Sequence, residues 1–158
     1  MNKIVSIKEA LKLGIEAQRA GNNLEANNYY KAILQFQPNH SHANHNMGVL
    51  ALSSGKKLEA LQLFKNAIET NPEIGEFWLS YIDALIKLDH IDDAKSIFKQ
   101  AKEIGVKSDS FQHLEKILSG SNGTVSATKD SDKINYIVLD NLKLDKAIEL
   151  ASKKAQEG

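Results

Sequence analysis

The feature that most constrains the fold of this chain is a sequence pattern that recurs every 34 residues. The segments 6–38, 40–72 and 74–106 align without gaps. The alignment brings together one alanine and one aromatic ring per segment and, in the first two segments, two glycines and a proline: Ala26, Ala60 and Ala94; Tyr30, Phe64 and Phe98; Gly14 and Gly48; Gly21 and Gly55; Pro38 and Pro72. A fixed period of this length is typical of stacked supersecondary units, each of which buries its apolar face against the next.

The recurring residue types predict two helices in each unit. Gly14, Gly48 and the alanines are small enough to let paired helices approach closely, while the aromatic rings fill the space between the units. Gly21 and Gly55 suit the left-handed turn that ends a helix, and a proline suits the boundary between one helix and the next. The helices are expected near residues 6–20, 23–36, 41–53, 57–70, 75–88 and 91–104.

This pattern resembles the tetratricopeptide repeat, a helix–turn–helix unit of the same length. The third segment matches the family pattern through Trp78, Tyr81, Ala94 and Phe98, and departures from the pattern are Ile33, Ile82 and Val106. The resemblance covers about residues 5–107. It implies an all-α superhelical solenoid of antiparallel helix pairs, with three repeats at about 7–40, 41–74 and 75–108.

The remainder of the chain is expected to hold a capping helix, a flexible linker and a C-terminal helix. Residues 109–118 place Phe111 and other apolar residues on one helical face, with Asp109 as a predicted N-cap. This helix would cover the end of the third repeat and complete a domain of residues 5–118. Residues 119–133 are rich in Gly, Ser, Thr and Asp and predict a flexible linker.

The sequence of the C-terminal segment 134–158 predicts an amphipathic helix. The sequence leaves open two interpretations of this helix. Shifted by 137 positions, it matches the first helix of the array, with Leu144 on Ile7 and Ala147 on Ala10. It is therefore either the first helix of a further repeat or an ordinary amphipathic helix. Because its apolar face needs a partner, we expect it to pack against a groove of its own array or to mediate self-association with another copy.

Composition excludes several classes of function. The 158 residues include 20 Lys plus Arg and 20 Asp plus Glu, so the formal net charge is zero and no basic excess favours nucleic acid as a partner. The absence of cysteine excludes disulfides and thiolate sites. No apolar run approaches the length of a signal-peptide core or a membrane span. We therefore expect a cytoplasmic protein with neither a nucleic-acid nor a membrane partner.

Few residue patterns in the chain carry chemistry. It contains no phosphate-binding glycine loop, nucleophile elbow or H-E-x-x-H pair, so no enzymatic activity and no cofactor are expected. The stretch 39–48 holds His40, His42 and His45, which first suggests a metal site. In the repeat register Asn39 is a predicted N-cap, and His42 and His45 share one helical face whose position at a helix N-terminus disfavours protonation. We interpret the cluster as the polar end of a binding groove.

The resemblance to the tetratricopeptide family implies that the first helix of each repeat lines a concave, peptide-binding face. The residues at matching positions are Lys8, Leu11, Lys12, Ile15, Arg19, His42, His45, Asn46, Val49, Leu52, Glu76, Leu79, Asp83 and Ile86. Their apolar centre and mixed charges suit an amphipathic helix or an apolar-anchored peptide. Of the residues that grip peptide carboxylates in one branch of the family, only Asn46 is matched here, so that binding mode is not expected.

The resemblance implies a non-catalytic module that binds a protein or peptide partner on this face. The second unit is also similar to the repeats of O-linked N-acetylglucosamine transferases and related bacterial transferases, in which an asparagine at the position of Asn46 contacts the substrate backbone. An alternative function is therefore the substrate-recruiting part of a larger glycosyl-, sulfo- or other transferase. The neighbouring repeats carry Lys12 and Ser80 at this position, so a ladder of asparagines is absent.

Overall fold

A computed structural model of the chain describes residues 5–106 and 110–120, and every regular element among them is an α-helix. The helices are α1 (Ile7–Arg19), α2 (Asn23–Phe36), α3 (Ser41–Ser53), α4 (Lys57–Thr70), α5 (Gly75–Lys87), α6 (Ile91–Ile104) and α7 (Ser110–Gly120). The predicted all-α fold is thereby confirmed, and the first six helices begin and end within one residue of their predicted positions. The predicted C-terminal helix 134–158 and most of the predicted linker lie outside the described residues.

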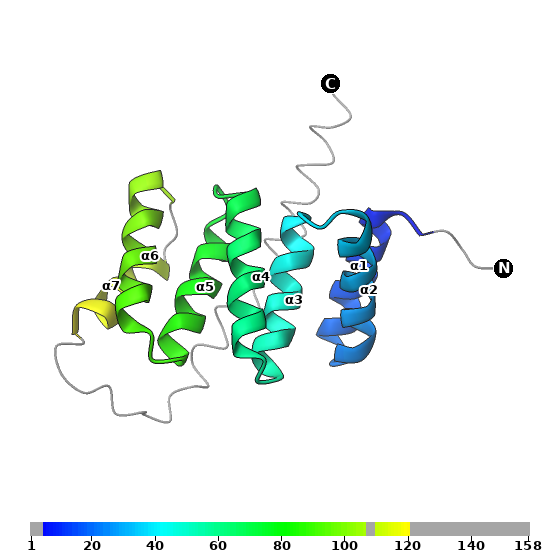
Figure 1. The fold of residues 1–158 in the computed structure, drawn as a ribbon, viewed down its shortest axis with the longest axis horizontal. Coiled ribbons are helices and arrows are strands. Elements are labelled where there is room, and N and C mark those ends of the chain that lie inside the picture. Colours follow the sequence, from blue (N-terminus) through cyan, green and yellow to red (C-terminus); the bar gives the residue numbers. More distant parts are fainter. Residues whose placement is uncertain (1–4, 107–109, 121–158) are drawn as a thin grey trace, which may run out of the picture. The chain divides into compact units, whose positions relative to one another are not determined.

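Helices α1–α6 form three antiparallel pairs in chain order (Figure 1). All six lie in the first of the two compact units into which the chain divides, Met1–Gln112 and His113–Gly158. Successive pairs meet through α2 with α3 and through α4 with α5, and α3 also contacts α5 directly. The first helices of the second and third pairs therefore approach each other along one side of the row.

Within the first two pairs, an aromatic ring of the second helix lies directly against a glycine of the first. A Cβ atom placed on Gly14 would lie 2.6 Å from Tyr30 Cε1, and one on Gly48 would lie 2.8 Å from Phe64 Cε1. Both rings are buried. In the third pair Ile82 replaces the glycine, and α5 and α6 approach each other less closely than α3 and α4 do.

The turn inside every pair is closed by the same backbone hydrogen bonds. A residue of positive φ ends each first helix: Gly21 (φ 78°), Gly55 (φ 76°) and Asp89 (φ 62°). The next residue donates its N–H to the carbonyl five positions earlier: Asn22 to Ala17 (2.8 Å), Lys56 to Ala51 (2.9 Å) and His90 to Leu85 (2.9 Å). This Schellman arrangement satisfies carbonyls at the helix end. The predicted glycine stops are confirmed, while Asp89 holds a conformation that costs a non-glycine residue about 1 kcal/mol.

The loops between pairs are tied to the following helix through their proline carbonyls. Asn44 Nδ2 donates to the carbonyl of Pro38 over 2.9 Å, and Trp78 Nε1 donates to that of Pro72 over 2.8 Å. The two donors stand 34 positions apart and differ greatly in size. The repeat therefore preserves a hydrogen-bond donor at this position rather than a particular side chain.

Helix α7 ends at Gly120, two residues into the predicted linker. At its beginning the Phe111 ring meets the Phe98 ring of α6 edge to face, with centroids 5.5 Å apart. Leu114 and Leu118 are buried, as is Phe111. The predicted N-cap Asp109 lies outside the described residues, and the capping role of α7 stays a prediction.

The contact between Gly48 and Phe64 predicts that Gly48→Ala destabilises the array. The added methyl group overlaps the ring, which typically costs about 1–3 kcal/mol and outweighs the gain of about 1 kcal/mol in helix propensity. Denaturant unfolding should show a reduced free energy of unfolding. Because Phe64→Leu removes the overlapping ring atoms, the double variant should lose less stability than the sum of the two single variants. Additive losses would show that the ring does not limit the space at Gly48.

Candidate functional site

The residues predicted for the binding face all lie on α1, α3 and α5, at three levels of exposure. Lys8, Lys12 and Arg19 are exposed; His42, Val49, Leu52, Glu76 and Ile86 are half-buried; Leu11, Ile15, His45, Asn46, Leu79 and Asp83 are buried. The first two groups combine apolar and charged side chains at the surface. The buried group includes polar side chains, which require hydrogen-bond partners.

His45 joins α3 to α5 through a pair of buried hydrogen bonds. Its Nδ1 lies 3.1 Å from Asn46 Oδ1, and its Nε2 lies 2.8 Å from Ser80 Oγ. An amide oxygen can only accept, so Nδ1–H donates to Asn46 and Nε2 accepts from the Ser80 hydroxyl. In the neutral imidazole, both ring nitrogens therefore have a hydrogen-bond partner. The ring also packs against Phe64 and Phe77, with centroids 5.8 and 4.9 Å away.

The polar contacts continue from Asn46 back to the first pair. The Tyr30 hydroxyl donates to Gln18 Oε1 over 2.7 Å. Burial raises the pKa of Tyr30, and a hydrogen bond with the Asn46 side chain partly opposes this rise. Side chains of α1, α2, α3 and α5 are thus linked in one series, Gln18, Tyr30, Asn46, His45 and Ser80, which we call the polar relay.

His42 lies beside the relay and has a buried nitrogen. Its Nε2 has no hydrogen-bond partner among the described residues. Its ring meets that of Phe77 edge to face, with centroids 5.3 Å apart. Burial, with a smaller contribution from the nearby His40, lowers the pKa of His42 to about 4. Burial likewise lowers the pKa of His45 to about 4.

These findings correct two expectations about the histidine cluster. The N-cap of α3 is His40 rather than Asn39, because His40 Nδ1 accepts the backbone N–H of Ala43 over 3.2 Å. The predicted resistance of His42 and His45 to protonation has the right direction, but its main cause is loss of solvation and not the helix dipole. Within the described ranges, no three His, Cys, Asp or Glu side chains are grouped so as to hold a metal ion.

The hydroxyl, imidazole and amide of Ser80, His45 and Asn46 follow the order of a hydrolase triad. All three side chains are nevertheless buried. A general base works best when its pKa lies near the operating pH, whereas the pKa of His45 is about 4. The arrangement is better suited to holding α3 against α5 than to activating a nucleophile.

The repeat register places Gln18 on the predicted face and Ser80 at the position of Asn46, but it did not predict that these side chains and Tyr30 are linked in the relay. Tyr30 was expected only to fill space, and its hydroxyl was the unused signal, because Phe64 and Phe98 fill the equivalent positions without one. Asp83, by contrast, was predicted for the face and is buried. Burial raises its pKa, against the opposing effect of Lys87, whose Nζ lies 2.8 Å from Asp83 Oδ2.

Comparison with known proteins supports the assignment of the fold. Residues 51–118 match the tetratricopeptide repeat family model. A search of curated proteins finds no sequence match. Similar solved structures include a tetratricopeptide repeat protein from Parabacteroides merdae (20% identity, TM-score 0.65, 87% of this chain and 53% of that one). The tetratricopeptide domain of Arabidopsis OM64 is also similar (17% identity, TM-score 0.64, 72% and 94%).

A mutant O-GlcNAc transferase from Thermobaculum terrenum is similar as well, with 22% identity and a TM-score of 0.63. The match covers 71% of this chain but 22% of the transferase. At such identities the likeness shows the fold alone. Residues 51–118 thus match the tetratricopeptide repeat family model, and the helix pairs and structural neighbours show that the described part of the chain has the all-α helical repeat fold. None of the helices in the described part is long and apolar enough to cross a membrane.

The buried histidines predict that the array loses stability in mild acid. A histidine whose pKa is about 4 when folded and about 6.5 when unfolded takes up a proton on unfolding between these values, so stability falls as the pH drops from about 6.5 to 4. For His45 the loss approaches about 3 kcal/mol. Denaturant unfolding at a series of pH values measures it. His45→Gln should flatten the curve over this range, and parallel curves for the two proteins would contradict the prediction.

Proposed function

We propose that this protein is a non-catalytic interaction module that binds a peptide or an amphipathic helix on the face formed by α1, α3 and α5. One observation carries the proposal. Val49, Leu52 and Ile86 are large aliphatic residues that are only half-buried on these helices. Val49 and Leu52 pack against the buried cluster around Phe64, and the part of their surface that stays exposed is available to the apolar side chains of a ligand. Leu52 and Ile86 occupy equivalent positions in consecutive repeats.

The distribution of charge around these aliphatic residues favours an oriented ligand. Lys8, Lys12 and Arg19 come from α1, where Lys12 also pairs with Glu16 over 3.9 Å. Glu76 comes from α5, where Asp83 is buried against Lys87. A peptide that buries apolar side chains at its centre, with its acidic end toward the first repeat and its basic end toward the third, would complement both ends. A structural neighbour also supports peptide binding: the first tetratricopeptide domain of Spaghetti (RPAP3), bound to an HSP90 peptide, matches with 18% identity and a TM-score of 0.62.

Two further expectations remain predictions. A substrate-recruiting role beside a transferase domain is consistent with the similarity to the Thermobaculum terrenum enzyme, but that similarity shows only a shared fold. The cytoplasmic location expected from the sequence is likewise untested by the fold.

A pair of lysine substitutions should abolish partner binding on this face. Leu52→Lys combined with Ile86→Lys places two charges among its half-buried aliphatic residues, so partners captured by the wild-type protein from cell extract should be lost. Leu58→Lys is the matched control, because Leu58 is 83% exposed on α4, outside the predicted face. Circular dichroism would establish that all variants stay folded. If the double variant and the control retain the same partners as the wild type, the face is wrongly assigned.

We also propose that residues 134–158 allow copies of the chain to associate, since their sequence matches that of α1. In the full chain, Leu144→Lys with Ile148→Lys places charge on the apolar face of the predicted helix and should remove any concentration-dependent increase in mass. Sedimentation equilibrium measures this directly. Lys153→Glu, which changes charge on the same segment without entering the apolar set, should leave association intact. A wild-type chain that stays monomeric over the concentration range would contradict the proposal.

A further inference from the structure

A pocket of about 400 Å³ lies between the second and third helix pairs. Its walls come from α4, α5 and α6, and its lining residues are Leu61, Tyr81, Leu85, His90, Asp93, Ser96 and Ile97. We call it the Tyr81 pocket. Tyr81 follows Leu79 by two residues, which corresponds to a rotation of roughly 200° around α5. The pocket therefore lies on a different side of α5 from the predicted peptide-binding face.

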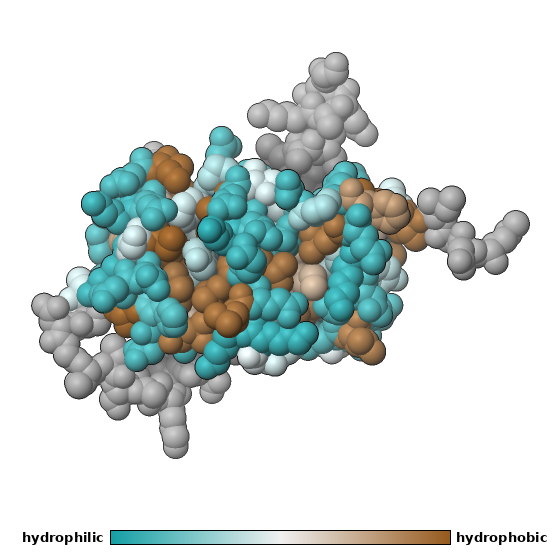
Figure 2. All heavy atoms as spheres, viewed as in Figure 1, coloured by the Kyte–Doolittle hydropathy of each residue, from teal (hydrophilic) through white to brown (hydrophobic). Residues whose placement is uncertain are grey.

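A small apolar patch lies on the surface of the helices that line the pocket. Figure 2 shows apolar side chains gathered over part of α4 and α5 and surrounded by hydrophilic side chains. In the pocket itself, Leu61, Leu85 and Ile97 provide aliphatic walls, and all three are buried or half-buried. An apolar wall of this kind suits the methylene groups of a long side chain.

The Asp93 carboxylate lines the pocket together with the Tyr81 phenol. Burial raises the pKa of Tyr81, and the charges of Asp93 and then Glu69 raise it further. In the described part of the chain, the ion-pair partner of Asp93 is His90, with Nδ1 3.2 Å from Oδ2. Glu69 is paired with the exposed Lys65 over 3.7 Å. A cation placed at the phenol would thus meet favourable charge from the Asp93 carboxylate, which lines the pocket.

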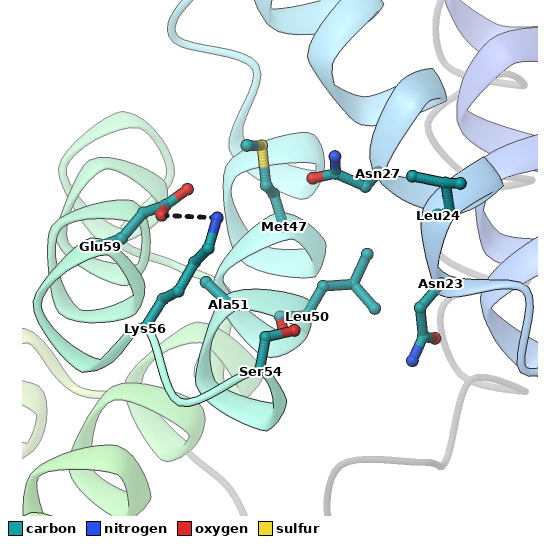
Figure 3. Close-up of a pocket in the computed structure, with 9 residues that line it drawn as sticks. All are labelled: Asn23, Leu24, Asn27, Met47, Leu50, Ala51, Ser54, Lys56 and Glu59. Carbon is teal, nitrogen blue, oxygen red and sulfur yellow. Dashed lines mark hydrogen bonds and ion pairs between the residues drawn. The ribbon is translucent and has the colours of Figure 1, made fainter.

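The preceding joint of the array contains an equivalent pocket of about 190 Å³ with a different charge arrangement. Met47, Lys56 and Glu59 in that pocket stand 34 positions before Tyr81, His90 and Asp93. Figure 3 shows the Lys56 amine reaching Glu59 across the start of α4, over 3.4 Å. There the chain supplies its own cation, whereas the Tyr81 pocket has a histidine at that position and an aromatic ring in place of the methionine.

We propose that the Tyr81 pocket binds a basic side chain of a protein partner, arginine in preference to lysine. The guanidinium lies against the Tyr81 ring and is bonded by the Asp93 carboxylate, and the aliphatic stem lies along Leu61 and Ile97. Arginine is preferred because its planar guanidinium can stack on an aromatic ring and fork onto a carboxylate, which an ammonium group cannot do. This site is separate from the peptide-binding face and adds a second contact surface to the array.

The test is a titration of the ¹⁵N-labelled full chain with a capped five-residue peptide that carries one arginine between glycines. The amide signals of Leu61, Tyr81 and Ile97 should shift with the arginine peptide. A peptide with citrulline, which is the neutral isostere, should bind at least about fivefold more weakly, and the lysine peptide should fall between them. Equal binding of the citrulline and arginine peptides, or no shift up to roughly 10 mM peptide, would overturn the proposal.

Two variants locate the effect in the pocket. His90→Lys installs the internal cation that Lys56 provides in the preceding joint, and it should weaken binding of the arginine peptide at least about fivefold. Asp93→Asn should do the same by removing the carboxylate. Glu59→Gln is the matched control, because Glu59 holds the equivalent position at the start of α4, and it should leave binding unchanged. If Glu59→Gln weakens binding as much as Asp93→Asn, the peptide recognises acidic surface in general and the site is refuted.

Discussion

The contact of an aromatic ring with bare glycine backbone sets the separation of the helices in the first two pairs. The Tyr30 ring packs against Gly14 and the Phe64 ring packs against Gly48. The two helices of each pair therefore lie close together, with the buried ring filling the space between them. The αL turn before the second helix is then short enough to close with two hydrogen bonds. The third pair lacks the glycine, and its two helices lie less closely together.

The three repeats share one backbone arrangement, and residue differences between them determine which polar and aromatic side chains meet between the repeats. Positions 45 and 80 bring an imidazole and a hydroxyl together between the second and third pairs, where the first repeat has Leu11 and Lys12 at the corresponding sites. Position 81 is an aromatic residue where its counterpart is a methionine. Because the helices themselves are held in place by other residues, such substitutions change the surface and the joints without changing the architecture.

The helices were predictable because the residues that define them act locally. Gly21, Gly55 and the two prolines mark turns and boundaries by their own backbone preferences, so the period of 34 gave their positions to within a residue. The relay was not predictable, because it depends on which side chains meet across 35 residues of chain, as His45 and Ser80 do. The main cause of the lowered histidine pKa values was also not predictable, because it is the extent of burial, and helical periodicity does not give that extent.

The hydrogen bond between His45 and Ser80 has a consequence for how an array of this kind can change in length. The turns are contained within single repeats, so copying a repeat copies them as well, whereas the hydrogen bonds to the carbonyls of Pro38 and Pro72 join consecutive repeats. The bond to Ser80 belongs to the joint, and a copy of the first repeat inserted after the second would put the counterpart Lys12 opposite the buried imidazole. Because a buried lysine beside an aromatic cluster is strongly unfavourable, such an insertion between the second and third repeats would destabilise their joint.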